Sequence, residues 1–329
     1  MKITRAIPMG ALSVCSVLAL VVAGCSSDEG SGSADPAAAT SAPTTEATTT
    51  TTAGPPVDPV SGAGAPEVVA DGFGFLEGVT WNADDGTLLF TDKEGQLLEL
   101  GTDDEVTVVE PDTDIADIDG DGAGGLVATE PDVGTVVQVT VDGTREVLAD
   151  GLDGVAFSGP NGVAAASDGT VWFTDFAPGA DTPLGYRGVF RVSPEGAVTA
   201  EVEMDPEATA PNGIALSPDQ ETLYVSDTLG NSFTAYDIAP GGGLDAAAAP
   251  AFVADFEGFP DGVCVDATGN IFVIGGGAGV SAYAPDGTLW GSIALPDPQA
   301  QPTNCAVGGD DGRTLFVTTS TTLYRIALA

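Results

Sequence analysis

The stretch Asn212-Gly-Ile-Ala-Leu-Ser-Pro-Asp-Gln-Glu-Thr-Leu-Tyr-Val-Ser-Asp227 holds two short β-rich segments joined by a turn. Its pattern is a polar residue and Gly before an apolar run, then a turn and a second apolar run, and it recurs along the chain. The second runs end at positions 92, 130, 175, 227, 275 and 319, so successive intervals are 38, 45, 52, 48 and 44 residues. Intervals of this size without helical periodicity indicate propeller blades rather than helical repeats.

Each copy divides into four short strands separated by turn residues. In the third copy we expect strands over 162–166, 170–175, 188–192 and 198–202. The sixth copy stops after a third strand at 323–327, while Glu67-Val-Val-Ala-Asp-Gly72 resembles the fourth strands of other copies. We therefore predict an all-β, six-bladed β-propeller of four-stranded blades over residues 64–329. Its last blade is closed by the N-terminal strand, which removes an open sheet edge.

Composition excludes several classes of function. The chain has no His, which rules out Ser-His-Asp triads and His-ligated zinc. Its 8 Lys and Arg against 49 Asp and Glu give a net charge of −41, which repels nucleic-acid backbones and anionic lipid. We expect a small-molecule substrate, no nucleic-acid partner and a monomer.

The N-terminus has the pattern of a lipoprotein signal peptide over residues 1–24. Lys2 and Arg5 precede an apolar run that ends in Val22-Ala-Gly-Cys25, which resembles a lipobox. Residues 25–63 are rich in Ser, Thr, Pro and Ala and are expected to form a disordered linker. We predict an exported protein, anchored to the extracytoplasmic side of the cell membrane through a lipid on Cys25. The alternative is an ordinary signal peptide with an incidental cysteine.

Two further cysteines, Cys264 and Cys305, lie in apolar strand sequence. An exported protein permits a disulfide. Free buried thiols that act as small hydrophobes are the preferred interpretation.

The candidate site lies where the innermost strands begin. These strands line the central channel of a propeller, so equivalent starting positions converge on its axis. They hold Glu77, Asn161, Asn212, Asp261 and Asn304, and the second copy offers one of residues 114–117. Carboxylates gathered in a narrow channel need a cation among them, and oxygen ligands favour Ca²⁺ or Mg²⁺/Mn²⁺ over Zn²⁺. The alternative is that Asn and Gly only shape a turn.

The motifs that carry a family resemblance occur in a fixed order and spacing. They are Leu76-Glu-Gly-Val79, Gly159-Pro-Asn-Gly162, Pro211-Asn-Gly-Ile214, Phe259-Pro-Asp-Gly262 and Pro302-Thr-Asn-Cys305. From about Pro66 to Ala329 the chain resembles the SMP-30/gluconolactonase/luciferin-regenerating enzyme family of six-bladed propellers, related to diisopropylfluorophosphatase.

This resemblance implies that Glu77, Asn212 and Asp261 hold one divalent metal ion, with Asn161 as a fourth ligand or a substrate contact. It implies Ca²⁺ as the preferred ion, with Mg²⁺, Mn²⁺ or Zn²⁺ as alternatives. It further implies that the protein hydrolyses lactones, with Asp261 as general base or nucleophile and Asn161 as the second catalytic residue. The chain departs from the family at Gly159, where some sugar lactonases carry a substrate-binding Arg.

Two alternative functions use the same site: a non-catalytic ligand-binding propeller of the cell envelope, and a hydrolase of other esters or phosphotriesters. Two weaker signals have plain structural interpretations. Asp117-Ile-Asp-Gly-Asp-Gly122 looks like part of a calcium loop, but a hairpin between strands explains it better because no helices flank it. Arg187 is either a contact for an anionic substrate or a surface salt bridge.

Overall fold

The computed structural model describes residues 57–176, 182–246, 249, 251–275 and 279–329, all within one compact unit, Thr51–Ala329. The predicted signal peptide, the lipidated Cys25 and most of the linker lie outside the described residues. The described part begins at Val57, before the predicted domain start at residue 64. Residues there already contact the blades, since Ala329 N donates to Pro59 O at 3.0 Å and Gly64 N to Ala327 O at 2.8 Å.

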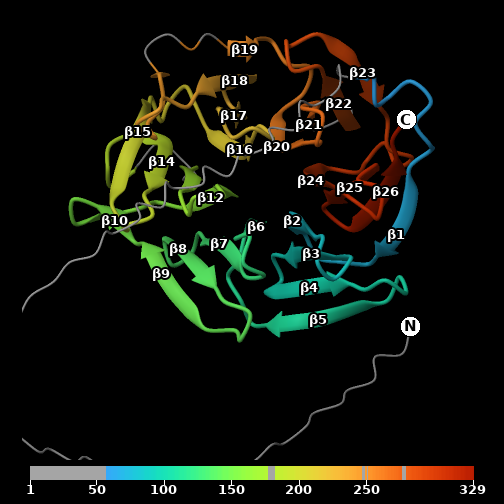
Figure 1. The fold of residues 1–329 in the computed structure, drawn as a ribbon, viewed down its shortest axis with the longest axis horizontal. Coiled ribbons are helices and arrows are strands. Elements are labelled where there is room, and N and C mark those ends of the chain that lie inside the picture. Colours follow the sequence, from blue (N-terminus) through green and yellow to red (C-terminus); the bar gives the residue numbers. More distant parts are fainter. Residues whose placement is uncertain (1–56, 177–181, 247–248, 250, 276–278) are drawn as a thin grey trace, which may run out of the picture. The chain divides into compact units, whose positions relative to one another are not determined.

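Six four-stranded antiparallel sheets follow one another around a centre (Figure 1). Blade 1 consists of β2 (Leu76–Asn82), β3 (Thr87–Asp92), β4 (Gln96–Leu100) and β5 (Val106–Pro111). Blade 2 consists of β6 (Ile118–Gly120), β7 (Leu126–Glu130), β8 (Thr135–Val139) and β9 (Arg145–Ala149). After a small hairpin of β10 (Gly151–Leu152) and β11 (Val155–Ala156), blade 3 consists of β12 (Pro160–Ala165), β13 (Val171–Asp175), β14 (Arg187–Val192) and β15 (Val198–Met204).

The other three blades repeat this order. Blade 4 consists of β16 (Pro211–Leu216), β17 (Thr222–Asp227), β18 (Ser232–Asp237) and β19 (Ala251–Val253). Blade 5 consists of β20 (Pro260–Val265), β21 (Ile271–Gly275), β22 (Gly279–Tyr283) and β23 (Leu289–Ile293). Blade 6 consists of β24 (Pro302–Gly308), β25 (Thr314–Thr319), β26 (Thr322–Ala327) and β1 (Glu67–Asp71).

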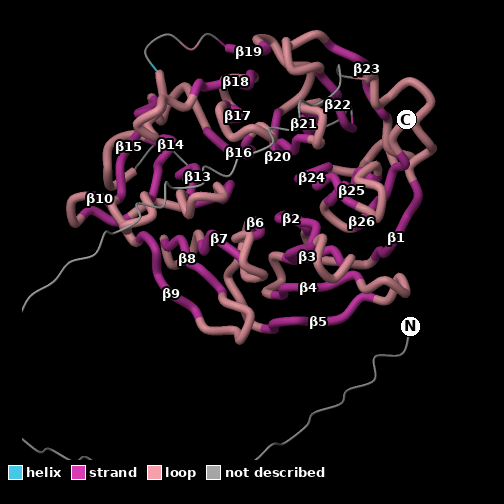
Figure 2. Tube along the Cα trace, viewed as in Figure 1, coloured by secondary structure: helices cyan, strands magenta, loops and turns pink. Residues whose placement is uncertain are grey.

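The ring closes as predicted. Strand β1 pairs antiparallel with β26, placing Glu67 opposite Arg325, so the N-terminal strand completes the last blade. Each innermost strand contacts the innermost strands of both neighbouring blades, including β2 with β24. Strands and loops make up the ring in Figure 2, and the described residues contain no α-helix. The six-bladed propeller is therefore confirmed.

The apolar core lies between neighbouring blades. Where blades 2 and 3 meet, the Phe157, Phe173 and Phe190 rings have centroids 5.0–5.3 Å apart. A second cluster joins blades 4 and 5 through Phe233 and Tyr283, whose ring centroids are 5.2 Å apart. Because strand side chains alternate between faces, each sheet buries residues against both neighbours, and the contacts between blades fix where each inner strand begins.

Hydroxyl groups near the ends of the second strands link each blade to the next. Each donates a hydrogen bond of 2.5–2.8 Å to a carbonyl at the start of the next inner strand. The donors are Thr91, Thr129, Thr174, Ser226 and Thr318. Blade 5 breaks the series, because its equivalent residue is the buried Ile274.

A disulfide joins blades 5 and 6, where the hydroxyl bond is missing. Cys264 on β20 and Cys305 on β24 are bonded, with an S–S distance of 2.06 Å, and the bond joins the inner strands of blades 5 and 6. The preferred interpretation of two free thiols is therefore wrong. The cross-link supplies the connection that a hydroxyl makes between the other blades.

A search for membrane-spanning helices among the described residues found no helix both long and apolar enough to cross a bilayer.

Candidate functional site

The hydroxyl series fixes the register of the inner strands. Thr91 Oγ1, Thr174 Oγ1 and Ser226 Oγ accept hydrogen bonds of 2.8–2.9 Å from the backbone N–H groups of Gly78, Gly162 and Gly213. The residues before these glycines, Glu77, Asn161 and Asn212, are therefore equivalent. Asp261 precedes Gly262 in the same position on β20. The four predicted metal ligands thus occupy one shared strand position.

A register shift occurs at this position in every one of the four strands. In β16 Pro211 pairs with Asp227 and the next paired residue is Ile214, so Asn212 and Gly213 form the irregular step. The same shift spans Glu77 in β2, Asn161 in β12 and Asp261 in β20. Bulges of this kind re-aim side chains and are frequent beside active sites.

The Gly after each site residue is required by close packing between inner strands. A Cβ on Gly213 would clash with the carbonyl oxygen of Asp261 and the Cα of Gly262. A Cβ on Gly162 would meet Asn212 O in the same way. The repeated Asn-Gly and Asp-Gly pairs therefore bring consecutive site residues together rather than forming hairpin turns.

Two blades lack this Gly, which corrects the alignment made from sequence. The hydroxyls of Thr129 and Thr318 accept from the N–H groups of Asp117 and Asn304, both at 3.1 Å. Asp117 and Asn304 therefore occupy the glycine position, and Asn304 is not equivalent to Asn212. The residues before them, Ala116 and Thr303, occupy the ligand position.

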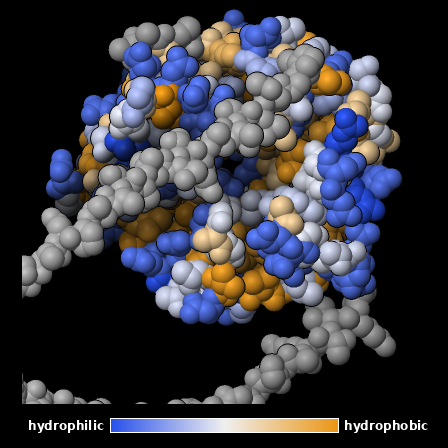
Figure 3. Space-filling view, viewed as in Figure 1, coloured by the Kyte–Doolittle hydropathy of each residue, from blue (hydrophilic) through white to orange (hydrophobic). Residues whose placement is uncertain are grey.

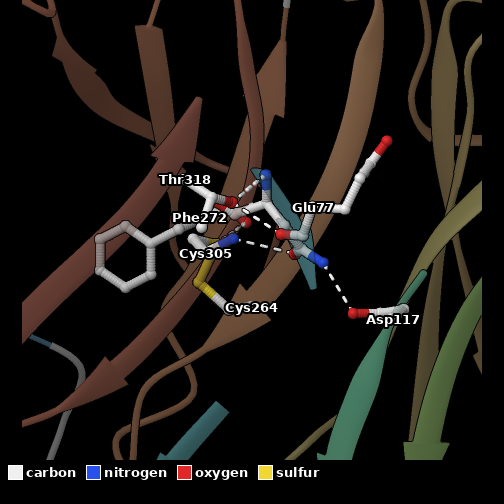
Figure 4. Close-up of a disulfide and its surroundings, with 7 residues drawn as sticks. Glu77, Asp117, Cys264, Phe272, Cys305 and Thr318 are labelled. Carbon is white, nitrogen blue, oxygen red and sulfur yellow. Dashed lines mark hydrogen bonds between the residues drawn. A yellow bond between two sulfur atoms is a disulfide. The ribbon is translucent and has the colours of Figure 1, made fainter. Parts of the chain in front are cut away.

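Asp117 and Asn304 bond to each other beside Glu77. Asn304 Nδ2 donates to Asp117 Oδ1 at 3.0 Å, and Asn304 Oδ1 accepts from Cys305 N at 2.8 Å (Figure 4). The other Asp117 oxygen, Oδ2, accepts from Val163 N at 3.1 Å. In Figure 4 the Glu77 carboxylate points away from the disulfide. This pair connects blades 6, 2 and 3. The sequence placed Asn304 and one of residues 114–117 at inner-strand starts but did not predict the bond between them.

The amide of Asn212 has a defined orientation. Its Nδ2 donates to Thr228 Oγ1 at 3.1 Å. The same side chain lowers the pKa of the Asp261 carboxyl and so partly opposes the effect of burial. Thr228 Oγ1 in turn donates to Pro260 O at 2.7 Å. Because the amide nitrogen is engaged by Thr228, the Asn212 Oδ1 atom is available as an acceptor for a cation.

Buried carboxylates dominate the electrostatics of the site. Burial raises the pKa of Glu77 to about 7, although Lys93 opposes the shift. Burial, followed by repulsion from Glu77 and Asp117, raises the pKa of Asp261 well above its usual range. Burial likewise raises the pKa of Asp117 to about 8. Asp117 lies beside the Glu77 strand, since a Cβ on Gly78 would be 2.9 Å from Asp117 Oδ1. A cation would relieve the repulsion between these carboxylates.

The predicted ligand set fits a divalent cation by its chemistry. It comprises two carboxylates and two amides, all with hard oxygen atoms, and one amide has its nitrogen already engaged. Among the residues that the structure describes, no group of three or more His, Cys, Asp or Glu side chains has metal-site geometry. The amide oxygens of Asn161 and Asn212 are the ligands that the predicted set adds to its two carboxylates.

Beyond Asp117 the channel continues as a cavity of about 300 Å³. Val79, Val163, Ile214 and Val263 contribute to its lining, together with Asp119. The visible face of the ring in Figure 3 mixes hydrophilic and apolar side chains around a central opening. The polar starting positions thus form one level of a longer channel.

Two weaker signals can now be assigned. Residues 117–122 belong to the β6–β7 hairpin, which confirms the hairpin interpretation over the calcium loop. In its turn, Asp121 Oδ1 accepts hydrogen bonds from Ala123 N and Gly125 N, both at 2.8 Å. The surface salt bridge considered for Arg187 is wrong, because this side chain is 3% exposed. It lies 5.7 Å from the centre of the Phe176 ring and donates to Thr209 O, between blades 3 and 4.

The fold and the site define a six-bladed propeller with an oxygen-rich axial centre. Residues 75–321 match the SMP-30/Gluconolactonase/LRE-like region, and the chain belongs to this family.

A gluconolactonase of Zymomonas mobilis is 28% identical over 79% of this chain and 80% of its own length. An L-arabinolactonase of Azospirillum brasilense is 34% identical over 43% of this chain and 46% of its own length. Among solved structures, a gluconolactonase from Xanthomonas campestris has a TM-score of 0.71 at 29% identity and covers 80% of this chain and 89% of its own.

Proposed function

We propose that this protein is a metal-dependent lactonase that opens cyclic esters to hydroxy acids. The observation that carries the proposal is the shared position of Glu77, Asn161, Asn212 and Asp261 at the bulges of four inner strands. Family membership and the lactonase names of its relatives support the same reaction. A gluconolactonase-like activity is the starting hypothesis.

Asp261 is the proposed general base. Burial raises the pKa of Asp261, and a carboxylate with a raised pKa is a stronger base when ionised. It takes a proton from water as the water oxygen attacks the lactone carbonyl carbon. The ring C–O bond then breaks, and the leaving oxygen takes up a proton to give the hydroxy acid. Asn161, at the equivalent position of blade 3, is proposed to hydrogen-bond the substrate.

The proposed cofactor is one divalent cation, held by Glu77, Asn161, Asn212 and Asp261. When bound, such an ion supplies Lewis-acid polarisation of the carbonyl. The all-oxygen donor set favours Ca²⁺, with Mg²⁺ or Mn²⁺ as alternatives and Zn²⁺ last. The hydrogen bond from Asn212 Nδ2 to Thr228 Oγ1 orients the Asn212 amide for this role.

The test is hydrolysis of glucono-δ-lactone and δ-valerolactone followed with a pH indicator. We expect Asp261→Asn to lower kcat by about 10²–10⁴-fold, the usual contribution of a general base. Chelation of divalent cations should abolish the reaction, and Ca²⁺ should restore it. As a matched control, Asp286→Asn on an exposed turn should leave the rate unchanged. Full activity of Asp261→Asn, or after chelation, would refute the proposal.

A non-catalytic ligand-binding propeller remains the competing function. It uses the same cation to hold a ligand and predicts calcium binding without turnover of any lactone. Hydrolysis of aryl esters or phosphotriesters at the same centre is the other alternative, and the same assay with those substrates separates it.

We also propose that the protein is exported and anchored through lipid on Cys25. The Cys264–Cys305 disulfide supports export, because such bonds persist in oxidising compartments. Metabolic labelling with a palmitate analogue should mark the wild-type protein and not Cys25→Ser. Labelling of both proteins, or of neither, would contradict the anchor.

A further inference from the structure

We propose that the preferred substrate is an uncharged lactone with an alkyl substituent, and that Leu229 and Phe259 hold the alkyl group. This inference rests on the proposed lactonase function and adds a substrate class to it. It concerns the loop face, defined as the face that carries the loops leading into the inner strands and the loops joining second to third strands.

Large exposed apolar side chains on the described residues follow a pattern. Five lie on outermost strands, where one sheet face meets solvent: Val68, Val108, Val109, Val147 and Leu289. Four lie on the loop face: Val133, Val155, Leu229 and Phe259. Only Val57 and Val141 are left for the opposite side of the described ring. Apolar side chains therefore concentrate around the end of the channel where the site residues lie.

Leu229 and Phe259 flank, in sequence, two hydrogen-bonded residues next to the proposed metal ligands. The Leu229 residue is 57% exposed and Phe259 is 66% exposed. Each is adjacent in sequence to one partner of the 2.7 Å hydrogen bond from Thr228 Oγ1 to Pro260 O. Phe259 also lies two residues before Asp261. An apolar surface at this place lies beside a substrate bound at Asn212 and Asp261.

The same rim disfavours charged and sugar-like substrates. Asp255 and Glu257 are exposed beside Phe259, and Asp132 is exposed beside Val133. These carboxylates repel an anionic substrate and favour release of the anionic product. Gly159, where some sugar lactonases carry a substrate-binding Arg, offers no side-chain donor to a polyol. A neutral ring with an apolar arm fits this environment best.

The experiment compares kcat/KM for δ-lactones with no substituent and with linear alkyl substituents of two, four and six carbons. A fully buried methylene contributes about fourfold in affinity and a half-buried one about twofold. The six-carbon substituent has four more methylenes than the two-carbon one, so we expect kcat/KM to rise about 16-fold between them. In the double variant Leu229→Ser/Phe259→Ser this rise should fall below threefold.

Val141→Ser, on the opposite side, is the matched control and should keep the wild-type chain-length dependence. If simple lactones are hydrolysed but chain length has no effect, or if the double variant keeps the full dependence, the inference is overturned while the lactonase function stands. A preference for glucono-δ-lactone over every alkyl lactone would also overturn it. Hydrolysis of no lactone at all would overturn both.

Discussion

Replacing Thr228 by Val should weaken cation binding although Thr228 is not itself a proposed ligand. Its hydroxyl accepts from Asn212 Nδ2 at 3.1 Å and donates to Pro260 O at 2.7 Å. Valine has the same shape but makes neither bond. At about 1 kcal/mol for each hydrogen bond, the loss is about 2 kcal/mol. If all of it falls on the bound state, the dissociation constant for Ca²⁺ rises about 30-fold.

Titration calorimetry of the wild-type protein and Thr228→Val with Ca²⁺ measures this effect. Thr228→Ser, which retains the hydroxyl, should bind within about threefold of the wild type. Thr199→Val, on the exposed side of β15, controls for the substitution itself. Wild-type affinity in Thr228→Val would refute the orientation assigned to Asn212. Equal loss in the Val and Ser variants would show that the hydroxyl is not the cause.

Two further predictions concern the ring. The double variant Cys264→Ala/Cys305→Ala removes a cross-link between residues separated by 41 positions in the sequence, so the free energy of unfolding in urea should fall by about 4 kcal/mol. An equal unfolding midpoint of the wild-type protein with and without reductant would contradict this. Gly213→Ala should destabilise the fold by more than 2 kcal/mol because its Cβ overlaps the Asp261 backbone. Gly241→Ala, where a Cβ meets nothing within 4 Å, should change stability by less than 1 kcal/mol, and similar values for both would show that the inner strands are not closely packed.

The repeat, the blade number and the closing strand were predictable from sequence because they depend on local chemistry. Alternating apolar residues recur in each blade, and Asp-Gly turns such as Ser167-Asp-Gly169 occur in four of the six hairpins between first and second strands. Glu77, Asn212 and Asp261 were found because each precedes a Gly. That Gly is required by the spacing of neighbouring inner strands.

Asn304 was predicted in the wrong register and Asp117 was not singled out from residues 114–117, because both replace the Gly itself. In their blades the motif is broken, and alignment on polar-Gly pairs shifts the register by one residue. Alignment on the hydroxyls of Thr91, Thr129 and Thr318 would have found both, since the bond from hydroxyl to backbone N–H is kept in those blades.

The disulfide was also missed, because buried cysteines in apolar strands look alike whether bonded or free. The available signal was Ile274, where the other five blades carry Thr or Ser. The missing hydrogen bond between blades 5 and 6 indicated that another interaction joins them. That this interaction is a disulfide could not be predicted, because it requires the two Cα atoms to be close together. Their distance of 5.7 Å is known only from the structure.

The central claim is that far-apart stretches of the chain gather oxygen ligands around one ion on the propeller axis. Anomalous diffraction from crystals grown with Ca²⁺ tests it most directly. We predict one peak on the axis, with oxygen atoms of Glu77, Asn212 and Asp261 about 2.4 Å away. A peak elsewhere, or carboxylates of Glu77 and Asp261 turned away from a shared point, would contradict the claim.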